Sequence, residues 1–443
     1  PAMPETQVTA HPDRLAGRTS FDKRRDIGRQ LAEADQSAML VTQPENIAWL
    51  LNIRGNDVPH TPFALSFGIL RAGGRFDWFI DPSRIDTKAR QHIGDKVHIH
   101  ASDKISAALG KLKGKVRLEP ETTPLWFAAH VKGTEIVHGE DLCTAAKACK
   151  TKAEIKGAKA AHLRDGAALC RFLCWLDAYG RTGKISEIDA ARKAEAFRAE
   201  TGKLRDLSFD TISGSGPNGA IVHYRVTHAT NRRLRPGDLY LIDSGGQYAD
   251  GTTDVTRTVL IEGRPPPRGA IDAFTRVLRG HIALAAARFP TGTNGMQLDT
   301  LARAPLWAAG QDFDHGTGHG VGSYLSVHEG PQRISKGGMV AMAPGMIVSN
   351  EPGYYATGRF GIRIENLQYV RAAKNAGDKH RDMLEFEALT LAPIDRRLID
   401  KSALTADENL WLNNYHAEVL GKVKPLVDMR TAKWLEKACR PIR

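Results

Sequence analysis

Residues 238–259 read DLYLIDSGGQYADGTTDVTRTV, and this stretch decides how the chain around it folds. Asp243 lies in an apolar run that predicts a strand, residues 250–251 (Asp-Gly) are typical of a turn, and Asp254 belongs to a second predicted strand. An antiparallel pair of these strands can place the two carboxylates side by side, where like charges destabilise a sheet unless a cation neutralises them. Two interpretations stay open here: a hairpin with polar outer residues, or a pair of metal ligands.

A glycine-rich segment further along the chain carries histidines. Residues 315–320 read HGTGHG, which places His315 and His319 where the backbone can turn tightly and approach a ligand closely. His328 follows, and three histidines so close together favour a functional site over structural roles. The sequence contains no His-Glu-x-x-His, so a helix-borne zinc peptidase site of that type is excluded. His223 ends a predicted strand after a glycine-rich loop, and by itself it is typical of a structural histidine.

Two later segments each carry a glutamate. Glu351 precedes Pro352, which holds its backbone extended. Residues 361–366 read GIRIEN and predict a strand with Arg363 and Glu365 on one face. A structural ion pair between these two side chains is the alternative to a ligand role for Glu365.

The candidate ligands are therefore four carboxylates and one imidazole. Clustered carboxylates repel each other and partly protonate unless cations neutralise them, and two divalent ions carry the matching four positive charges. If these side chains converge, they form a two-metal centre of hard oxygen ligands and one nitrogen. The residues in question are Asp243, Asp254, His319, Glu351 and Glu365.

Length and composition limit the class of protein. The chain has 443 residues, of which 42% are hydrophobic and 25% charged, as in a globular protein of two or three domains. No apolar stretch approaches the ~18 residues of a membrane span, and the first residues form no secretory signal, so we expect no membrane partner. The net charge of +12 is scattered among acidic residues, which favours a solvated surface over a nucleic-acid partner. The five cysteines are an odd number; we expect them to be reduced, in a cytoplasmic protein, with Cys170 and Cys174 in the core.

The pattern along the chain predicts an α/β (α+β) fold in several parts. We expect a linker or tail at residues 1–18 and a mixed α/β domain at 19–150. Thr151 and Glu154 form a predicted capping box that opens a long helix and a second domain, residues 151–398. Residues 399–443 predict a helical extension whose recurring apolar face either contacts a second copy of the chain or caps its own core.

The predicted elements of the first domain are a helix at 21–34 capped by Ser20, a short helix at 46–51, and strands at 38–42, 66–71, 75–80, 96–100 and 115–119. The predicted helices of the remainder span about 151–180, 186–202, 268–288, 296–309 and 405–440.

Together these segments resemble the aminopeptidase P (Xaa-Pro aminopeptidase) family of metallopeptidases with the pita-bread fold, and its long, cytosolic-type members most of all. The resemblance runs from residues 45–60 (ENIAWLLNIRGNDVPH) to residues 389–397 (LTLAPIDRR). It implies an N-terminal creatinase-like domain followed by a pita-bread catalytic domain. It also implies that the first domain of long members is absent here, so that the chain begins in the linker before the second domain. Residues 224–226 (Tyr-Arg-Val) depart from the family pattern, which bears on the S1 side of the cleft.

The resemblance also implies ligand roles. Asp243 is expected to chelate one metal, Asp254 and Glu365 to bridge both, and His319 and Glu351 to complete the second. Mn²⁺ is the expected metal, with Zn²⁺ or Co²⁺ as alternatives. A hydroxide between two divalent metals is expected to attack the carbonyl that precedes a proline.

The remaining roles follow from the same resemblance. Glu351 is expected to handle protons, and His223 and His328 to bind substrate and stabilise the tetrahedral oxyanion. His315 is expected to position the substrate, and Arg363 to orient Glu365 from behind. The expected partners are peptides with proline at the second position and a second copy of the chain in a homodimer.

Other members of the fold remain as alternatives. A prolidase, which cleaves Xaa-Pro dipeptides, is the closest of them. A methionine aminopeptidase generally lacks an α/β domain in front. Creatinase-like enzymes use the fold without metal, and the five intact ligand candidates argue against that alternative. Pita-bread domains also serve as non-catalytic binding modules, but these typically lose metal ligands.

Overall fold

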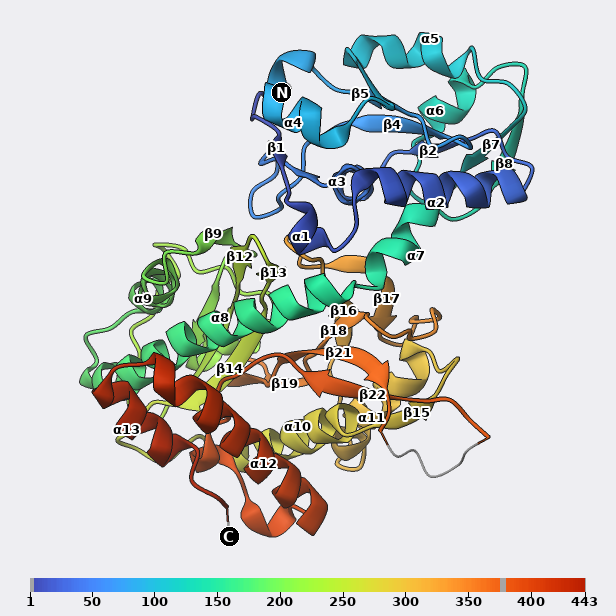
Figure 1. The fold of residues 1–443 in the computed structure, drawn as a ribbon. Helices are drawn as coiled ribbons and strands as arrows, with labels where there is room; N and C mark the ends of the chain where they lie inside the picture. Colours follow the sequence, from blue (N-terminus) through green and yellow to red (C-terminus); the bar gives the residue numbers. More distant parts are fainter. Residues whose placement is uncertain (1–3, 375–379, 443) are drawn as a thin grey trace. The chain divides into compact units, whose positions relative to one another are not determined.

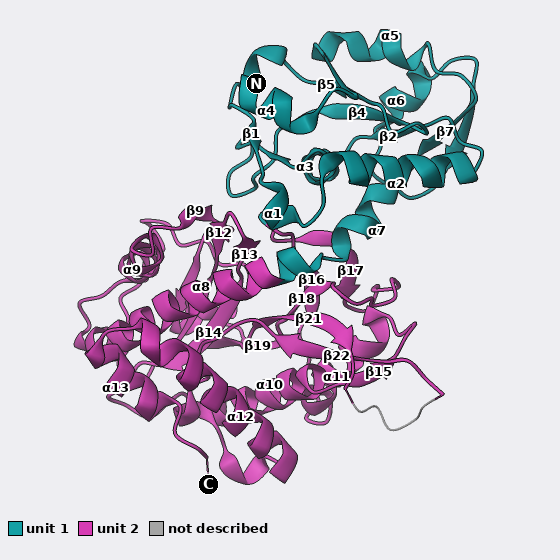
Figure 2. Cartoon of the chain, in the orientation of Figure 1, with its two compact units in different colours: residues 1–155, 324–326 teal, residues 156–323, 327–443 magenta. Residues whose placement is uncertain are grey.

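The computed structural model describes residues 4–374 and 380–442, which form two compact units (Figures 1 and 2). The first comprises residues 1–155 with 324–326, and the second residues 156–323 with 327–443. The division falls inside the long helix α8 (Lys152–Tyr179). The predicted capping box opens this helix, because the Thr151 N–H donates to Glu154 Oε2 at 2.8 Å and the Glu154 N–H donates to Thr151 Oγ1 at 3.2 Å.

The first unit is built on a six-stranded sheet of order β6-β5-β4-β2-β7-β8. The β4–β5 and β2–β4 pairs are antiparallel, and the other pairs are parallel. Strand β2 is buried throughout because alternate residues face separate cores, with Met39 and Val41 in one and Ala38 and Leu40 in the other. The strands are β2 (Ala38–Val41), β4 (Phe67–Arg71), β5 (Phe76–Phe79), β6 (Val97–His100), β7 (Lys115–Leu118) and β8 (Glu135–His138). The helices are α2 (Ser20–Glu33), α3 (Pro44–Leu51), α4 (Thr87–Ile93), α5 (Ile105–Leu109), α6 (Leu125–His130) and α7 (Leu142–Ala148).

Two details of the first unit differ from the sequence expectations. The cap of α2 is Thr19, whose Oγ1 accepts from the Asp22 N–H, while Ser20 is the first helical residue and is buried. The segment before it, expected as a linker or tail, contains β1 (Thr9–Ala10), which pairs with β3 (Ile53–Arg54), and α1 (Asp13–Ala16). Val8 is buried in the core, so packing anchors this segment although its own sequence is mostly polar.

The described residues of the second unit form four sheets, whose strands and margins carry the candidate ligands. A three-stranded sheet runs β10-β11-β14, a small one runs β13-β12-β9, and β19 pairs with β20. A six-stranded sheet has the order β15-β22-β21-β18-β16-β17. Their bounds are β9 (Leu204–Leu207), β10 (Ile212–Ser215), β11 (Leu239–Ser244), β12 (Gly246–Tyr248), β13 (Gly251–Thr252), β14 (Val255–Leu260), β15 (Arg288–Pro290), β16 (Gly318–Gly320), β17 (Glu329–Ile334), β18 (Ile347–Asn350), β19 (Gly353–Ala356), β20 (Phe360–Arg363), β21 (Asn366–Ala372) and β22 (Met383–Ala388).

Helices surround these sheets (Figure 1). Besides α8 they are α9 (Glu187–Ala199), α10 (Ala270–Ala285), α11 (Gly295–Trp307), α12 (Ala406–Val423) and α13 (Met429–Ala438). Leu412, Tyr415 and Val419 of α12 belong to the same core cluster as Phe274 and Val277 of α10. The apolar face of the C-terminal helices therefore caps the unit's own core, which was one of the two expectations for it.

The structure also tests the predictions about membrane-spanning segments and cysteines. In the part of the chain that is described, no helix is long and apolar enough to cross a membrane. All five cysteines are free, and Cys170 and Cys174 are buried, in agreement with core roles.

Candidate metal centre

The register of the β11–β14 pair positions the first two carboxylates. Asp243 lies opposite Thr256, and Ser244 lies opposite Val255, so Asp254 immediately precedes β14. The two aspartates are diagonal neighbours rather than a directly opposed pair. This follows from the register itself, which the small β12–β13 hairpin continues unchanged, with Gln247 opposite Thr252 and Tyr248 opposite Gly251. Both side chains are buried.

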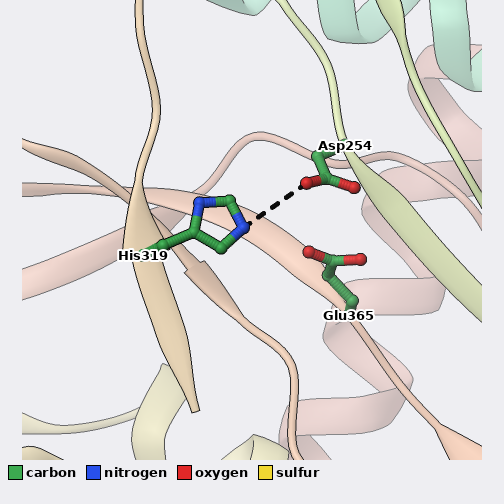
Figure 3. A group of neighbouring side chains, drawn as sticks. All are labelled: Asp254, His319 and Glu365. Carbon is green, nitrogen blue, oxygen red and sulfur yellow. Dashed lines mark ion pairs between the residues drawn. The ribbon is translucent and has the colours of Figure 1, made fainter. Parts of the chain in front are cut away.

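Three further ligand candidates come from the six-stranded sheet and its margins. His319 lies on β16, Glu351 directly follows β18, and Glu365 lies between β20 and β21. His319 Nε2 lies 3.5 Å from Asp254 Oδ2 and 3.5 Å from Glu351 Oε1. Asp254, His319 and Glu365 each offer one ligand atom, and these three atoms lie within 4.8 Å of one another. Figure 3 shows the three side chains grouped together. Segments far apart in the sequence thus converge on one point.

Backbone contacts fix the imidazole of His319. Its Nδ1 lies 2.9 Å from the Gly320 carbonyl oxygen, so that nitrogen carries the proton and Nε2 offers a lone pair toward the carboxylates. The His319 N–H donates to Ser349 Oγ at 2.9 Å, and Ser349 Oγ in turn donates to Glu351 Oε1 at 3.2 Å. The serine therefore ties the two ligand candidates together.

A relay of hydrogen bonds orients the carboxylates from behind. Arg363 Nη2 donates to Asp243 Oδ2 at 2.6 Å, and Arg363 Nε donates to Thr256 Oγ1 at 3.1 Å. Thr256 Oγ1 donates to Glu365 Oε2 at 2.7 Å, so Arg363 reaches Glu365 through a threonine and holds Asp243 directly. The other oxygens, Asp243 Oδ1, Asp254 Oδ1 and Glu365 Oε1, are buried without a hydrogen-bond partner. Buried carboxylate oxygens turned toward one another without donors fit divalent cations.

The pKa values of the clustered carboxyl groups also favour a cation site. Burial, and then repulsion by Asp243 and Glu351, raises the pKa of Asp254 well above its usual range. Burial, and then repulsion by Asp254 and Asp243, does the same to the pKa of Glu365. Burial also raises the pKa of Glu351. Without cations these groups are driven to bind protons, and the only buried cation paired with one of the carboxylates is Arg363, among the residues described.

Two more predicted histidines lie beside the cluster. The ring of His328 stands perpendicular to that of His319 with centroids 4.2 Å apart, and burial lowers the pKa of His328 to about 4. His315 Nε2 lies 2.8 Å from the hydroxyl of Tyr355, which itself accepts from Arg363 Nη1 at 2.7 Å. Burial, and then the charge of Arg363, lowers the pKa of His315 to about 3. Both imidazoles are neutral at physiological pH.

His223 is exposed, and the strand predicted to end in it is absent. The glycine-rich stretch instead forms the 3₁₀ helix η4 (Gly216–Ala220), after which the backbone is irregular. Gly219 packs so closely on Gly361 that a methyl group on Gly361 would lie 1.7 Å from the Gly219 carbonyl oxygen. His223 nevertheless lies near enough to His315 and His328 for its charge to lower the pKa of both.

Several residues that support the site carry no strong signal in the sequence. Tyr355 links His315 to Arg363, and Thr256 links Arg363 to Glu365. Glu187 accepts from the Ser215 N–H at 2.7 Å, from Asn218 Nδ2 at 3.0 Å and from the Arg232 N–H at 2.8 Å, and so holds both ends of the loop that carries His223. Of these residues, only Tyr355 could be suspected from the sequence, through the alternation of side chains on β19 and β20.

A fully buried arginine lies on the other side of the Glu365 backbone. Arg257 Nη1 donates to the Glu365 carbonyl oxygen at 2.6 Å, and Nη2 donates to Asn366 Oδ1 and to the Tyr415 hydroxyl, both at 2.9 Å. Its further acceptors are the backbone oxygens of Thr256, Ala392 and Pro393. No described carboxylate forms an ion pair with Arg257, so neutral acceptors alone compensate its charge. The C-terminal helix α12 thereby supports a ligand-bearing turn.

Comparison with family models places this centre in a known class. Residues 156–372 match the model of metallopeptidase family M24, and residues 1–154 match the creatinase/prolidase N-terminal domain. Residues 382–442 match the C-terminal region of peptidase M24. The fold and the site together are those of an M24 metallopeptidase.

Individual relatives identify the family within this class of metallopeptidases. All of the chain aligns with a probable Xaa-Pro aminopeptidase P of Laccaria bicolor, at 40% identity over 70% of that protein, and with aminopeptidase P2 of Arabidopsis thaliana, at 39% identity over 67%. The X-prolyl aminopeptidase of Caenorhabditis elegans, described as a cytosolic enzyme with a di-nuclear active site, superimposes on the whole chain with a TM-score of 0.93 at 38% identity, covering 74% of that structure. A dipeptidase of Bacillus anthracis, with a TM-score of 0.69 at 23% identity, shares the fold alone. The chain belongs to the Xaa-Pro aminopeptidase P family.

Proposed function

We propose that this protein is a metal-dependent aminopeptidase that hydrolyses the peptide bond between an N-terminal residue and a following proline. The observation that carries this proposal is the buried set of unpartnered carboxylate oxygens of Asp243, Asp254 and Glu365 beside His319. The similarity to an enzyme described as di-nuclear and X-prolyl supports both the number of metals and the substrate.

The residues that would hold two divalent ions are Asp243, Asp254, His319, Glu351 and Glu365. When bound, such ions supply a nucleophile from water near neutral pH and polarise the substrate carbonyl. We propose Mn²⁺ as the metal, because an oxygen-rich set with one imidazole suits it.

The chain's own side chains would supply the remaining chemistry. Glu351, held by Ser349, takes up the proton of the attacking water and returns it to the departing proline nitrogen. His328, neutral and next to His319, donates a hydrogen bond to the oxygen that becomes negative in the tetrahedral state. His223 and His315 bind the peptide on either side of the scissile bond, with His315 held in place by Tyr355.

The proposed setting of the enzyme is a cytosolic homodimer. The cytosolic description of the Caenorhabditis elegans relative and the five free cysteines support the location. The exposed face of α11 supports self-association, because it presents Met296, Leu301 and Trp307 to solvent.

Peptide hydrolysis before and after metal removal tests the proposed function. Protein stripped with a chelator is assayed against an Xaa-Pro-Xaa tripeptide and an Xaa-Pro dipeptide, then again with added Mn²⁺. We expect release of the first residue from the tripeptide only after Mn²⁺ is added. Cleavage of the dipeptide alone would replace this proposal with a prolidase activity, and no cleavage of either substrate by metal-loaded protein would refute an enzymatic role.

A further inference from the structure

A cavity lies in the second unit between α8, the end of β14 and α13, elements that Figure 1 labels. Its volume is about 130 Å³, and its lining includes none of the metal-ligand candidates. Most of its wall is apolar. The apolar lining includes Leu173, Leu176, Val259, Ile261, Ile394 and Trp434.

Two of the three acidic groups at this cavity, Asp177 and Asp395, have close partners, and the third, Glu262, has Arg181 Nη1 at 4.0 Å from its Oε2. Arg397 Nη1 donates to Asp177 Oδ1 at 2.7 Å, and Arg397 Nη2 donates to Asp395 Oδ2 at 2.8 Å. The Trp434 indole N–H donates to Asp177 Oδ2 at 3.2 Å, and the Leu260 N–H donates to Asp395 Oδ2 at 2.9 Å. Neither Asp177 nor Asp395 is therefore free to bind a cationic ligand.

Two cations that line the cavity, Arg396 and Lys437, enter no ion pair with a described residue. Arg396 donates from Nη1 to the Lys437 carbonyl oxygen and from Nη2 to that of Pro441, both at 3.3 Å, while its buried Nε has no hydrogen-bond partner. Across residues 4–374 and 380–442 this guanidinium enters no ion pair. Arg396 lines the cavity, and no described carboxylate compensates its charge there, so an anionic group of a ligand would be favourable beside it.

We propose that this cavity binds a small monocarboxylate with an apolar body of five to seven carbons, whose carboxylate accepts from Arg396. The size follows from the volume, since an engineered apolar cavity of about 150 Å³ holds one benzene molecule. The head group follows from geometry, because a planar guanidinium pairs best with a planar carboxylate. The site is separate from the metal centre, so the proposal stands or falls independently of the peptidase activity.

Equilibrium dialysis of labelled hexanoate against the metal-loaded protein tests this proposal. Unlabelled hexanoate, hexan-1-ol and hexylamine serve as competitors of equal chain length but different head charge. We expect one saturable hexanoate site per chain, for which hexanoate competes at least tenfold better than hexylamine. Absence of saturable binding, or equal competition by hexylamine, would overturn the assignment.

Two variants locate the bound ligand. Arg396→Met removes the proposed head-group partner and should weaken hexanoate binding at least tenfold while hexan-1-ol is little affected. Ala438→Leu, on the α13 wall of the cavity, fills the space with a residue that suits a helix and should abolish binding of both. Hexanoate bound at the metal centre would survive both substitutions, and that result would refute the proposal; peptide hydrolysis should be unchanged in both variants.

Discussion

Replacement of Asp254 by asparagine should change the stability of the metal-free protein and that of the metal-loaded protein in opposite directions. Ligand oxygens of Asp254 and Glu365 lie within 4.8 Å of each other in a buried site. Two unit charges at that separation repel by about 3 kcal/mol at an effective dielectric constant of about 20. The raised pKa values of both groups show that protonation relieves part of this repulsion. We therefore expect Asp254→Asn to stabilise the metal-free protein by about 1–3 kcal/mol.

The metal-loaded protein should respond in the opposite direction. A ligand at 100 times its dissociation constant stabilises a native protein by about 2.7 kcal/mol, so Mn²⁺ should raise the unfolding midpoint of the unsubstituted protein. Asp254→Asn should lose most of that increase because it removes one of the proposed carboxylate ligands. Calorimetric unfolding of both proteins, with chelator and with Mn²⁺, measures both effects.

A matched control is Asp299→Asn. Asp299 is equally buried but pairs with Arg303 at 2.8 Å, so its loss should destabilise the protein with or without metal. If metal-free Asp254→Asn instead behaved like Asp299→Asn, and Mn²⁺ still raised its midpoint, the reasoning from carboxylate repulsion would be refuted.

Three more perturbations probe other parts of the molecule. His328→Ala should retain Mn²⁺ in elemental analysis and lower kcat by about 10²–10³-fold, as expected of an oxyanion donor; loss of the metal would show that His328 is a ligand instead. Arg257→Met should weaken Mn²⁺ binding by about 10–100-fold in calorimetric titration, because it frees the Glu365 backbone, and unchanged affinity would contradict this support role. His416 Nε2 accepts from the Ile394 N–H at 3.1 Å, and burial lowers the pKa of His416 to about 3. Between pH 6.5 and 3 the imidazole therefore stays neutral in the native protein but gains a proton in the unfolded protein. The neutral His416 therefore makes the native protein less stable as the pH falls through that window. His416→Gln should reduce the slope of the unfolding free energy against pH, near pH 5, by about 1.4 kcal/mol per pH unit. An unchanged slope would show that His416 is protonated in the native protein.

The ligand candidates could be located from sequence because each sits in a local motif with a physical reason. Asp243 and Asp254 lie beside a turn, His319 lies among glycines, and Glu351 precedes a proline. What the sequence could not show is the tertiary support. Arg257 reads as an ordinary strand arginine until its neutral acceptors from three distant segments are seen.

The backbone around His223 shows the opposite case, in which a local pattern misled. Its glycines and apolar residues predict a loop followed by a strand, but Gly216 adopts a positive φ of 56° and begins a 3₁₀ helix. Close contact between Gly219 and Gly361 favours that path. Such packing between segments distant in sequence decides the backbone, and a single sequence does not reveal it.

The most direct test of the two-metal account is a calorimetric titration of chelator-stripped protein with Mn²⁺, with hydrolysis of an Xaa-Pro-Xaa tripeptide followed at each addition. The account predicts that two ions bind per chain and that the rate rises as they bind. Hydrolysis by the stripped protein at the rate of the Mn²⁺-loaded protein would contradict the account. A maximal hydrolysis rate reached without any bound Mn²⁺ would also contradict it.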